Sequence, residues 1–263
     1  VAQINPHTIE INYTDGRQMT IDFYGDNILR MFRDDKGGVV RDPVATPPAK
    51  ILTEFARRAT GHLSAIDVDG TLQITTPAVS VNIDKHTGNM NIVDLRTGKT
   101  VIENLTPAKI DNGSTSVTMR QHDGEYFYGG GVQNGRFSHR GESIAIENTN
   151  SWVDGGVASP TPFYWSTGGY GVMWNTFRPG RYDFGHDTPG EVRLQHSEDY
   201  LDMFVMLDAT PVQLLNDFYQ LTGNPVLMPK FGFYEGHLNA YNRDYWKEDK
   251  NGAMVFEDGK MYK

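Results

Sequence analysis

One short segment of the chain places an aromatic side chain between two polar ones at alternate positions: Asn150, Trp152 and Asp154. Gly155 and Gly156 follow at once, so we expect this segment to be a loop. Proteins hold sugar rings with the face of an aromatic side chain and a few convergent hydrogen-bonding groups. The trio therefore predicts a substrate-binding loop for a carbohydrate. The alternative, equally open at this stage, packs Trp152 into a core and uses Asp154 to cap the Asp-Gly turn.

Other candidate motifs favour turns over ion or phosphate sites. Residues 67–70, Asp-Val-Asp-Gly, begin like a calcium loop but lack the closing Glu. Residues 129–131 are three glycines with no Lys-Ser/Thr after them and no helix to open, which argues against a phosphate site. Two histidine and acid pairs lack a third ligand within reach along the sequence: His139 with Glu142, and His186 with Asp187. We predict no required metal and no cofactor.

Short strands must position the loop, because 28 Gly, 13 Pro, 13 Tyr and 13 Phe favour strands and tight turns over long helices. Residues 8–13 and 18–23 alternate between apolar and polar types around Asp15-Gly16, which predicts a hairpin. Further strands are predicted at these positions: 72–75, 79–83 and 90–94, with turns at 87–88 and 97–98. This spacing is typical of a meandering β-sandwich.

Residues 210–222 are predicted to form the one clear helix. Thr210 can cap its first turn, Pro211 suits the first helical position, and Gln213 lies three residues after the cap. Gly223 and then Pro225 end it. The predicted apolar stripe contains these residues: Val212, Leu215, Phe218, Tyr219 and Leu221.

The composition changes after the helix, and we place a domain boundary near Asn224. Residues 1–224 are predicted to form a β-sandwich domain. Residues 225–263 are predicted to be a linker followed by a first apolar strand at 231–234 and a polar, aromatic-rich tail.

Size and charge exclude several classes of protein. The chain has 263 residues, no cysteine and a formal net charge of -9, so disulfides are excluded and nucleic acid is not an expected partner. No apolar run approaches the roughly 20 residues needed to cross a bilayer. Because the chain begins with Val1, we expect that an upstream segment was removed, by a signal peptidase or by design. The expected location is periplasmic or extracellular.

Four segments in a fixed order carry a family resemblance: residues 81–90 with Asp94 and Gly98; Tyr-Phe-Tyr-Gly-Gly-Gly at 126–131; Pro-Phe-Tyr-Trp-Ser-Thr-Gly-Gly-Tyr-Gly-Val at 162–172; and Phe-Tyr-Gln-Leu-Thr-Gly-Asn-Pro at 218–225, continuing through Pro229-Lys230. Together they resemble the N-terminal portion of the family 31 glycoside hydrolases. The resemblance implies a galactose-mutarotase-like β-sandwich followed by the start of a (β/α)8 barrel. It also implies that the parent protein is a retaining α-glycosidase.

The chain departs from many α-glucosidases of this family. They carry a Glu where residues 131–133 read Gly-Val-Gln, and their following loop differs from residues 134–156 here. The sequence of this loop is similar to that of the family branch that acts on α-galactosides or α-N-acetylgalactosaminides. The resemblance therefore leaves three sugars open: galactose, N-acetylgalactosamine and glucose.

Retaining glycosidases need two carboxyl groups about 5 Å apart, and the family provides both as aspartates on later barrel strands. Because a barrel needs about 250 residues, we expect the catalytic pair to lie beyond Lys263. Other carboxylates of the chain have no spacing that marks a pair: Asp154, Glu235, Asp244 and Glu248. The resemblance also implies that the loop at 150–154 faces the barrel mouth and shapes the sugar pocket.

Three more substrate-binding residues are predicted just past the expected first barrel strand: His237, Asn239 and Tyr241. Barrel enzymes build their sites at such positions. The partners expected for this chain are an oligosaccharide or glycoconjugate and the rest of its own catalytic barrel. The alternative function is a non-catalytic carbohydrate-binding β-sandwich.

Overall fold

The computed structural model describes residues 1–34, 40–233, 247–252, 254–255 and 257–263. Contacts between Cα atoms divide the chain into two compact units, Val1–Asn224 and Pro225–Lys263. The first unit is built almost wholly of antiparallel strands, as the composition predicts.

The first unit contains these strands: β1 (Ala2–Asn5), β2 (Thr8–Asn12), β3 (Gln18–Phe23), β4 (Ile28–Asp34), β5 (Ser64–Val68), β6 (Thr71–Thr75), β7 (Val79–Asp84), β8 (Met90–Asp94), β9 (Lys99–Leu105), β10 (Lys109–Asp111), β11 (Ser114–Arg120), β12 (Phe127–Gln133), β13 (Ser143–Ile146), β14 (Val157–Ser166), β15 (Tyr170–Trp174), β16 (Gly180–Phe184), β17 (Glu191–His196) and β18 (Tyr200–Leu207). One helix, α1 (Pro211–Thr222), follows β18.

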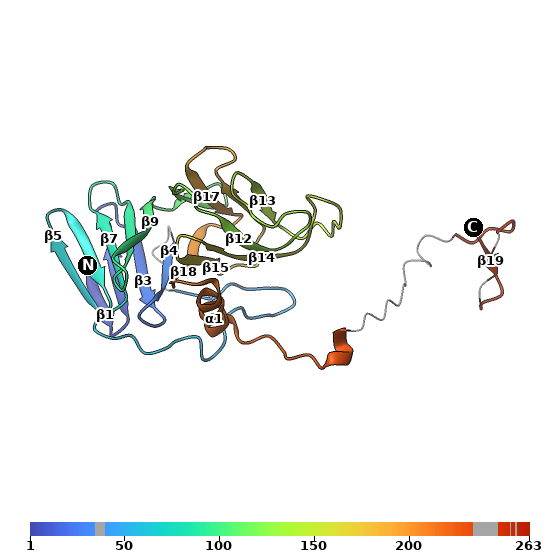
Figure 1. The fold of residues 1–263 in the computed structure, drawn as a ribbon, viewed down its shortest axis with the longest axis horizontal. Helices are drawn as coiled ribbons and strands as arrows, with labels where there is room; N and C mark the ends of the chain where they lie inside the picture. Colours follow the sequence, from blue (N-terminus) through green and yellow to red (C-terminus); the bar gives the residue numbers. More distant parts are fainter. Residues whose placement is uncertain (35–39, 234–246, 253, 256) are drawn as a thin grey trace. The chain divides into compact units, whose positions relative to one another are not determined.

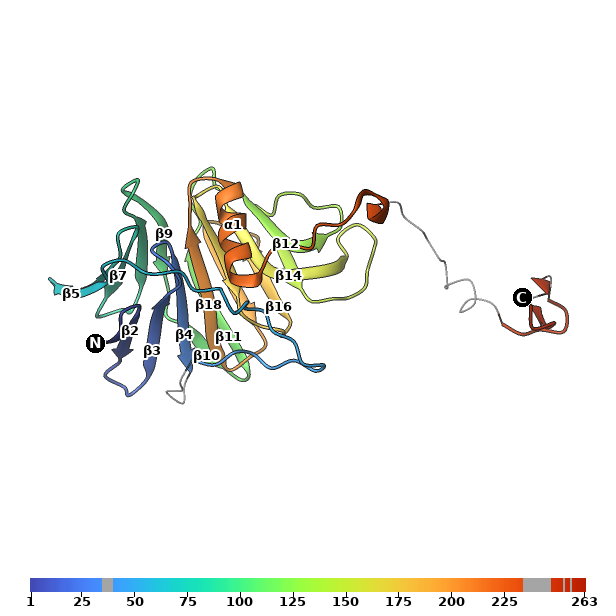
Figure 2. The same cartoon turned by 90° about the horizontal axis from the view of Figure 1, so that it is seen from below.

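Three sheets make up this unit (Figures 1 and 2). The largest has eight strands in the order β1-β2-β3-β4-β18-β15-β14-β12. The second has the order β5-β6-β7-β8-β9, and the third has the order β10-β11-β17-β16-β13. Strand β9 contacts β11, so the two smaller sheets are neighbours. The predicted hairpins are confirmed, because β2 pairs with β3 and β7 with β8.

The main core lies between the large sheet and the two smaller ones. Its buried side chains come from all three sheets, including Ile21, Val81, Val117 and Leu194. Strands such as β6 and β8 alternate between buried and more exposed residues, which is expected where only one face of a sheet is covered. The sandwich predicted from the alternation is therefore present.

A second core lies on the opposite face of the large sheet, under α1. It combines residues of the central strands with residues of the helix, including Phe163, Phe204, Leu214 and Leu221. Strands β4 and β15 are buried along their whole length, and β18 is buried except at its first residue. Coverage on both faces explains the almost continuous apolar sequences of β15 and β18.

The helix begins and ends where the sequence predicts. The Thr210 hydroxyl accepts a hydrogen bond from the Gln213 amide at 3.3 Å and donates one to Gln213 Oε1 at 2.7 Å. Gly223 adopts a φ of 89° and donates its amide to Tyr219 O. A hydrogen bond therefore caps each end of α1.

The buried face of α1 matches the predicted stripe in part. Leu221 is buried, and Leu215 and Phe218 pack against the same core, whereas Val212 is 67% exposed. Leu214 and Asp217 are also buried, and Asp217 was missed because a search for apolar spacing passes over a carboxylate. Asn27 Nδ2 donates to Asp217 Oδ2 at 2.9 Å, which makes this burial tolerable.

The second unit does not show the predicted start of a barrel among its described residues. Residues Lys230–Phe233 form a short 3-10 helix, η1, where a strand was predicted from position 231; Tyr234 lies outside the described residues. A parallel barrel strand needs hydrogen-bonded neighbours on both sides, and no described strand pairs with residues 230–233. The backbone instead bonds locally, from the Gly232 amide to Pro229 O at 2.8 Å. Two short strands, β19 (Met254–Val255) and β20 (Met261–Tyr262), pair further on.

The segment 67–70 forms the tight turn that was preferred over a calcium loop. Asp69 and Gly70 both have positive φ values, of 49° and 81°, as a two-residue hairpin turn between β5 and β6 requires. No helix among the described residues is long and apolar enough to cross a membrane.

Candidate functional site

The three glycines of β12 allow this edge strand to lie unusually close to β14. Gly129, Gly130 and Gly131 all have positive φ, and the pairing of β12 with β14 shifts register between Gly129 and Gly131. A Cβ on Gly131 would lie 2.1 Å from Ser159 O. Only glycine fits this bulge. The bulge lies just before the two loops that lead from β12 through β13 to β14, and bulges of this kind redirect the chain that follows.

The two loops, residues 134–142 and 147–156, are joined by hydrogen bonds from one asparagine. The Asn134 amide donates to Gly156 O at 3.0 Å, its carbonyl accepts from the Gly155 amide at 2.8 Å, and its side chain donates to Ser151 O at 2.8 Å. The resulting pair of loops, which we call the paired loop, lies beyond the ends of β12 and β14 (Figure 2).

His139 attaches the paired loop to the glycine bulge. Its Nε2 lies 2.8 Å from Gly129 O, in a position to donate a hydrogen bond. Burial lowers the pKa of His139, which keeps the ring neutral at pH 7. His139, which the sequence analysis considered with Glu142 as a possible pair of metal ligands, is thus placed to hold the paired loop.

The predicted trio lies together at the tip of the paired loop. Trp152 is 72% exposed, and its Nε1 donates to Asn150 Oδ1 at 3.1 Å. Asn150 itself has a left-handed backbone with a φ of 49°. Trp152 therefore does not pack in the core, and a polar neighbour restrains its exposed ring.

Asp154 is exposed and lies against Gly135 of the opposite loop, where a Cβ would come within 3.0 Å of Asp154 Oδ1. The turn that contains it is closed by the backbone, from the Gly156 amide to Val153 O at 2.8 Å. The carboxylate of Asp154 thus faces solvent beside the Trp152 segment. The other predicted trio, His237, Asn239 and Tyr241, lies outside the described residues.

An aromatic row that the sequence analysis did not single out as a site continues from the paired loop onto the large sheet. Tyr128 stacks on Trp165 with ring centroids 4.5 Å apart, and Phe137 meets the edge of Tyr128 at 5.5 Å. Phe137 is 86% exposed. The alternation of β12 and β14 is the signal for this row, because Phe127 and Tyr164 point inward and their neighbours Tyr128 and Trp165 do not.

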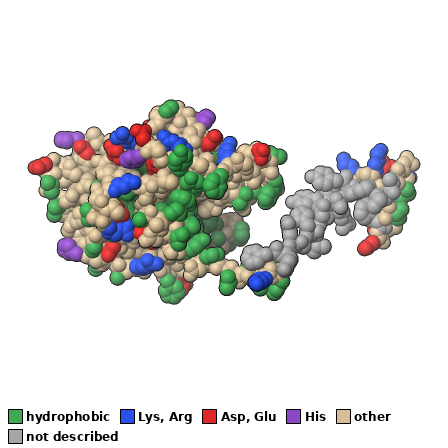
Figure 3. Space-filling view, in the orientation of Figure 1, with side chains coloured by type: hydrophobic (Ala, Val, Ile, Leu, Met, Phe, Trp, Pro, Cys, Tyr) green, Lys and Arg blue, Asp and Glu red, His purple; other side chains and the backbone are tan. Residues whose placement is uncertain are grey.

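A largely apolar groove of about 470 Å³ lies beside the same loop. Pro160, Pro162, Phe177 and Phe218 are among its lining residues, and Asn148 of the paired loop is at its rim. Figure 3 shows hydrophobic side chains gathered on this face, over α1 and β14. Contiguous apolar surface of this kind marks an interaction face in soluble proteins.

A family model for the "Glycosyl hydrolase 31 N-terminal galactose mutarotase-like domain" matches residues 18–183, well over half of the chain. The chain belongs to glycosyl hydrolase family 31. The resemblance seen in the four sequence segments is thereby confirmed.

Two curated relatives of this family 31 domain are α-xylosidases. In each of them the match covers only a small part of a much longer protein. One, from Emericella nidulans, is 31% identical over 149 residues, which cover 54% of this chain and 18% of the relative. The other, XylQ from Lactiplantibacillus pentosus, is 27% identical over 200 residues, which cover 72% of this chain and 24% of the relative. The chain therefore corresponds to about a quarter or less of either protein.

Solved structures of the family share the fold of this family 31 domain. A Flavobacterium johnsoniae dextranase, in a structure complexed with isomaltotriose, aligns with a TM-score of 0.75 over 87% of this chain and 28% of that one, at 15% identity. A soil-metagenome α-xylosidase complexed with xylose aligns with a TM-score of 0.71 over 86% of this chain and 35% of that one, at 16% identity. None of these four relatives is named for α-galactosides, so that branch stays a prediction.

Buried carboxylates of the family 31 domain are engaged by protein donors. Asp202 receives two hydrogen bonds from Arg30, both of 2.7 Å, and one from Asn175 at 2.8 Å. Burial nevertheless raises the pKa of Asp202. These contacts tie β18 to β4 and to the end of β15, which is a structural role.

Glu198, just before β18, is a buried acid whose pKa lies near neutral pH. Burial raises its pKa to about 7, and the nearby charge of Asp202 adds to this, whereas hydrogen bonds from Thr176 and Trp174 oppose it. The Thr176 hydroxyl donates to Glu198 Oε2 at 2.7 Å, and the Trp174 indole donates to Oε1.

The structure brings a third potential metal ligand, Asp183, next to the pair His186 and Asp187. Ligand atoms of the three lie within 4.8 Å of one another. The same carboxylates already have partners, since Asp183 accepts the amides of Gly185, His186 and Asp187. Asp187 also pairs with Arg181 at 2.7 Å. This arrangement is a capped turn whose acids are neutralised by the protein itself.

Proposed function

We propose that this chain is the substrate-shaping N-terminal domain of a retaining α-glycosidase that hydrolyses terminal α-linked sugars. The observation that carries the proposal is the exposed Trp152 ring, which Asn150 restrains at the tip of a loop bonded through Asn134. A restrained aromatic face is suited to stacking on the apolar face of a sugar ring. Asp154, beside it, offers a carboxylate to sugar hydroxyls.

The catalytic aspartates belong, in this proposal, to a barrel encoded beyond Lys263. The apolar groove beside Asn148 and the aromatic row of Phe137, Tyr128 and Trp165 supply the face on which that barrel packs. Packing there brings the paired loop to the rim of the active site. Binding energy gained at Trp152 then orients the sugar over the catalytic pair.

The sugar of the parent enzyme is proposed to be one of four. The amino-acid sequence of the loop favours galactose or N-acetylgalactosamine, the family resemblance allows glucose, and the names of two relatives add xylose. Nitrophenyl α-glycosides of these four sugars, tested with the parent enzyme, separate the alternatives by kcat/KM. The 263-residue chain alone is expected to hydrolyse none of them, and turnover by it would refute the placement of the catalytic pair.

The loop's role is tested by Trp152→Ala in the parent enzyme. Loss of one stacking aromatic should lower kcat/KM by about 10-fold to 100-fold, since such contacts contribute about 1.5 to 3 kcal/mol. Trp152→Phe should recover part of the loss because it keeps a ring. Phe55→Ala, which removes an aromatic that is 84% exposed outside the paired loop, is the matched control. Equal kcat/KM for Trp152→Ala and wild type would remove Trp152 from the site.

The alternative, a carbohydrate-binding sandwich without a catalytic partner, predicts a different outcome. Sugar would bind to the chain with the same affinity whether or not a barrel follows it. Hydrolysis by the parent enzyme with a Trp152-dependent kcat/KM excludes this alternative.

A further inference from the structure

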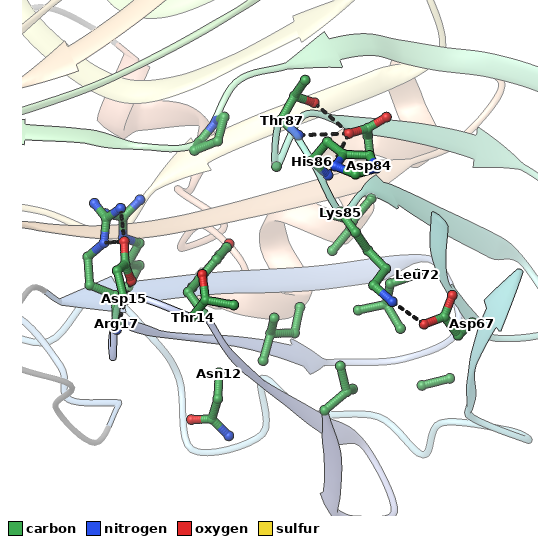
Figure 4. A pocket seen from close by; sticks show the side chains of 18 of the residues that line it. Asn12, Thr14, Asp15, Arg17, Asp67, Leu72, Asp84, Lys85, His86 and Thr87 are labelled. Atoms are coloured by element: carbon green, nitrogen blue, oxygen red, sulfur yellow. Dashed lines mark hydrogen bonds and ion pairs between the residues drawn. The ribbon is translucent and has the colours of Figure 1, made fainter. Parts of the chain in front are cut away.

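A cavity of about 670 Å³ opens between the β2–β3 hairpin and the sheet that contains β5 to β8 (Figure 4). Its volume is in the range typical of small-molecule sites. One wall carries residues of the turn after β2, such as Thr14 and Asp15. The other carries Asp67 from β5 and the turn residues Lys85 and His86 after β7.

The cavity is separate from the paired loop. In the large sheet, β2 and β12 are separated by β3, β4, β18, β15 and β14. With ~4.8 Å between neighbouring strands, the two edges lie on the order of 25–30 Å apart. Figure 1 shows β5 and β1 at one side of the first unit, and β12 to β14 at the other. One sugar residue cannot reach both places.

The cavity combines an apolar interior with a polar rim. Ile11, Leu72 and Ile83 line it and are buried. The rim presents Asn12, Thr14 and other side chains that can donate or accept hydrogen bonds, as Figure 4 shows. Pyranose rings have the matching division, with C–H groups on the ring faces and hydroxyls around the edge.

The charges of the lining side chains cancel. The acids are Asp15, Asp67 and Asp84, and the bases are Arg17, Arg33 and Lys85. Two of the acids are paired at the rim, since Asp15 bonds to Arg17 and Asp67 to Lys85. A neutral rim offers no net attraction to a phosphate or to a cation, but charged partners strengthen hydrogen bonds to hydroxyl groups.

Acceptor atoms remain on the rim after these internal contacts. The Thr87 amide, the Thr87 hydroxyl and the His86 amide all donate to Asp84 Oδ1, at 2.7, 3.0 and 2.9 Å. Lys85 donates to Asp67 Oδ2. Within the described parts of the chain, no donor occupies Asp84 Oδ2 or Asp67 Oδ1, so both can accept a hydroxyl from a ligand.

We propose that this cavity is a second carbohydrate-binding site, which takes a neutral sugar unit with one ring face on its apolar interior and its hydroxyls on the rim carboxylates. The inference follows from the lining of the cavity and does not depend on the role of Trp152. Such a site would hold a second part of an oligosaccharide, or a neighbouring chain of a polymer, away from the paired loop.

Saturation-transfer NMR and calorimetric titration of the 263-residue chain test the site. The probes are isomaltotriose, xylose, galactose and N-acetylgalactosamine, with glucose and glucose 6-phosphate as a neutral and charged pair. We expect saturable binding of at least one neutral probe, and weaker binding of glucose 6-phosphate than of glucose. Absence of saturable binding for every neutral probe overturns the proposal, and so does tighter binding of the phosphate.

Variants locate the binding. Ala65→Phe fills the cavity from β5 and should raise the Kd at least about tenfold. Asp84→Asn keeps an oxygen for the turn but replaces the other acceptor with a donor, so it should weaken binding even if Ala65→Phe fails to fold. Lys85→Ala removes a charged side chain from the rim and should also raise the Kd. Arg120→Ala breaks an exposed ion pair to Glu103 elsewhere and is the control that should leave the Kd unchanged. Binding that survives Ala65→Phe and Asp84→Asn but is lost in Trp152→Ala overturns the proposal and leaves the role of the paired loop intact.

Discussion

Replacing Glu198 with glutamine should make the domain more stable at pH 8 and leave its stability near pH 4.5 almost unchanged. The side chain is buried, with 6% of the residue exposed, and its pKa is raised from 4.5 to about 7 in the folded domain. Between these values the folded state holds a proton that the unfolded state has released. The free energy of unfolding therefore falls as pH rises through this window.

The size of the effect follows from the shift in pKa. Each unit corresponds to about 1.4 kcal/mol, so ionisation of Glu198 should cost the folded domain at most about 3 kcal/mol between pH 4.5 and pH 8. Glutamine imitates the protonated acid, because its oxygen can accept from Trp174 while its amide donates to the Thr176 hydroxyl. The variant should keep the contacts and lose the pH-dependent cost.

Urea unfolding of the 263-residue chain at several pH values measures this directly. The informative quantity is the difference between variant and wild type, since other groups titrate in both proteins; burial also raises the pKa of Asp217 to about 7. Glu142→Gln makes the same chemical change at an exposed position and is the matched control. A difference for Glu198→Gln that does not change with pH would refute the reasoning.

Two further predictions concern the large sheet. Gly131→Ala should destabilise the domain by at least about 3 kcal/mol, because the new Cβ meets Ser159 O and φ is positive; Gly141→Ala, with positive φ but open space, should cost only about 1 kcal/mol. Thermal unfolding of the two variants side by side measures this, and equal losses would mean that the close approach of β12 to β14 is unimportant. Arg30→Met should cost about 3–5 kcal/mol by leaving Asp202 buried without its cation. The loss in urea unfolding should grow as pH rises, because burial raises the pKa of Asp202 and only the ionised carboxylate needs the cation; a loss that does not change with pH would contradict this account.

Local patterns predicted the local structure well. The alternation around Asp15-Gly16 and the cap at Thr210 are properties of a few neighbouring residues, and both have the predicted form. On α1, the stripe of Leu215, Phe218 and Leu221 was predicted correctly, but the buried Asp217 was missed. Its burial depends on Asn27, which is 190 positions away in sequence, and no local rule connects the two.

The candidate site was predictable in part. From the sequence, Asn150 was grouped with Trp152 because both lie in one glycine-flanked loop, and in the structure a hydrogen bond joins their side chains. The aromatic row depends on the pairing of Tyr128 with Trp165 across two strands, which is visible only once the register is known. The predicted strand after Pro229 was wrong because a barrel strand depends on neighbours, and local sequence favours a turn there when no described strand pairs with it.

The position of β18 has a consequence for how the domain folds. This strand is the last of the first unit in sequence, yet it lies in the middle of the large sheet, where Tyr200 pairs with Asp34 on one side and Leu207 with Tyr170 on the other. The sheet cannot close until residue 207 has left the ribosome. Until then β4 and β15 are open edges, exposed to pairing with other chains. Such long-range pairing is also slow, so insertion of β18 is the step at which synthesis, folding and aggregation compete.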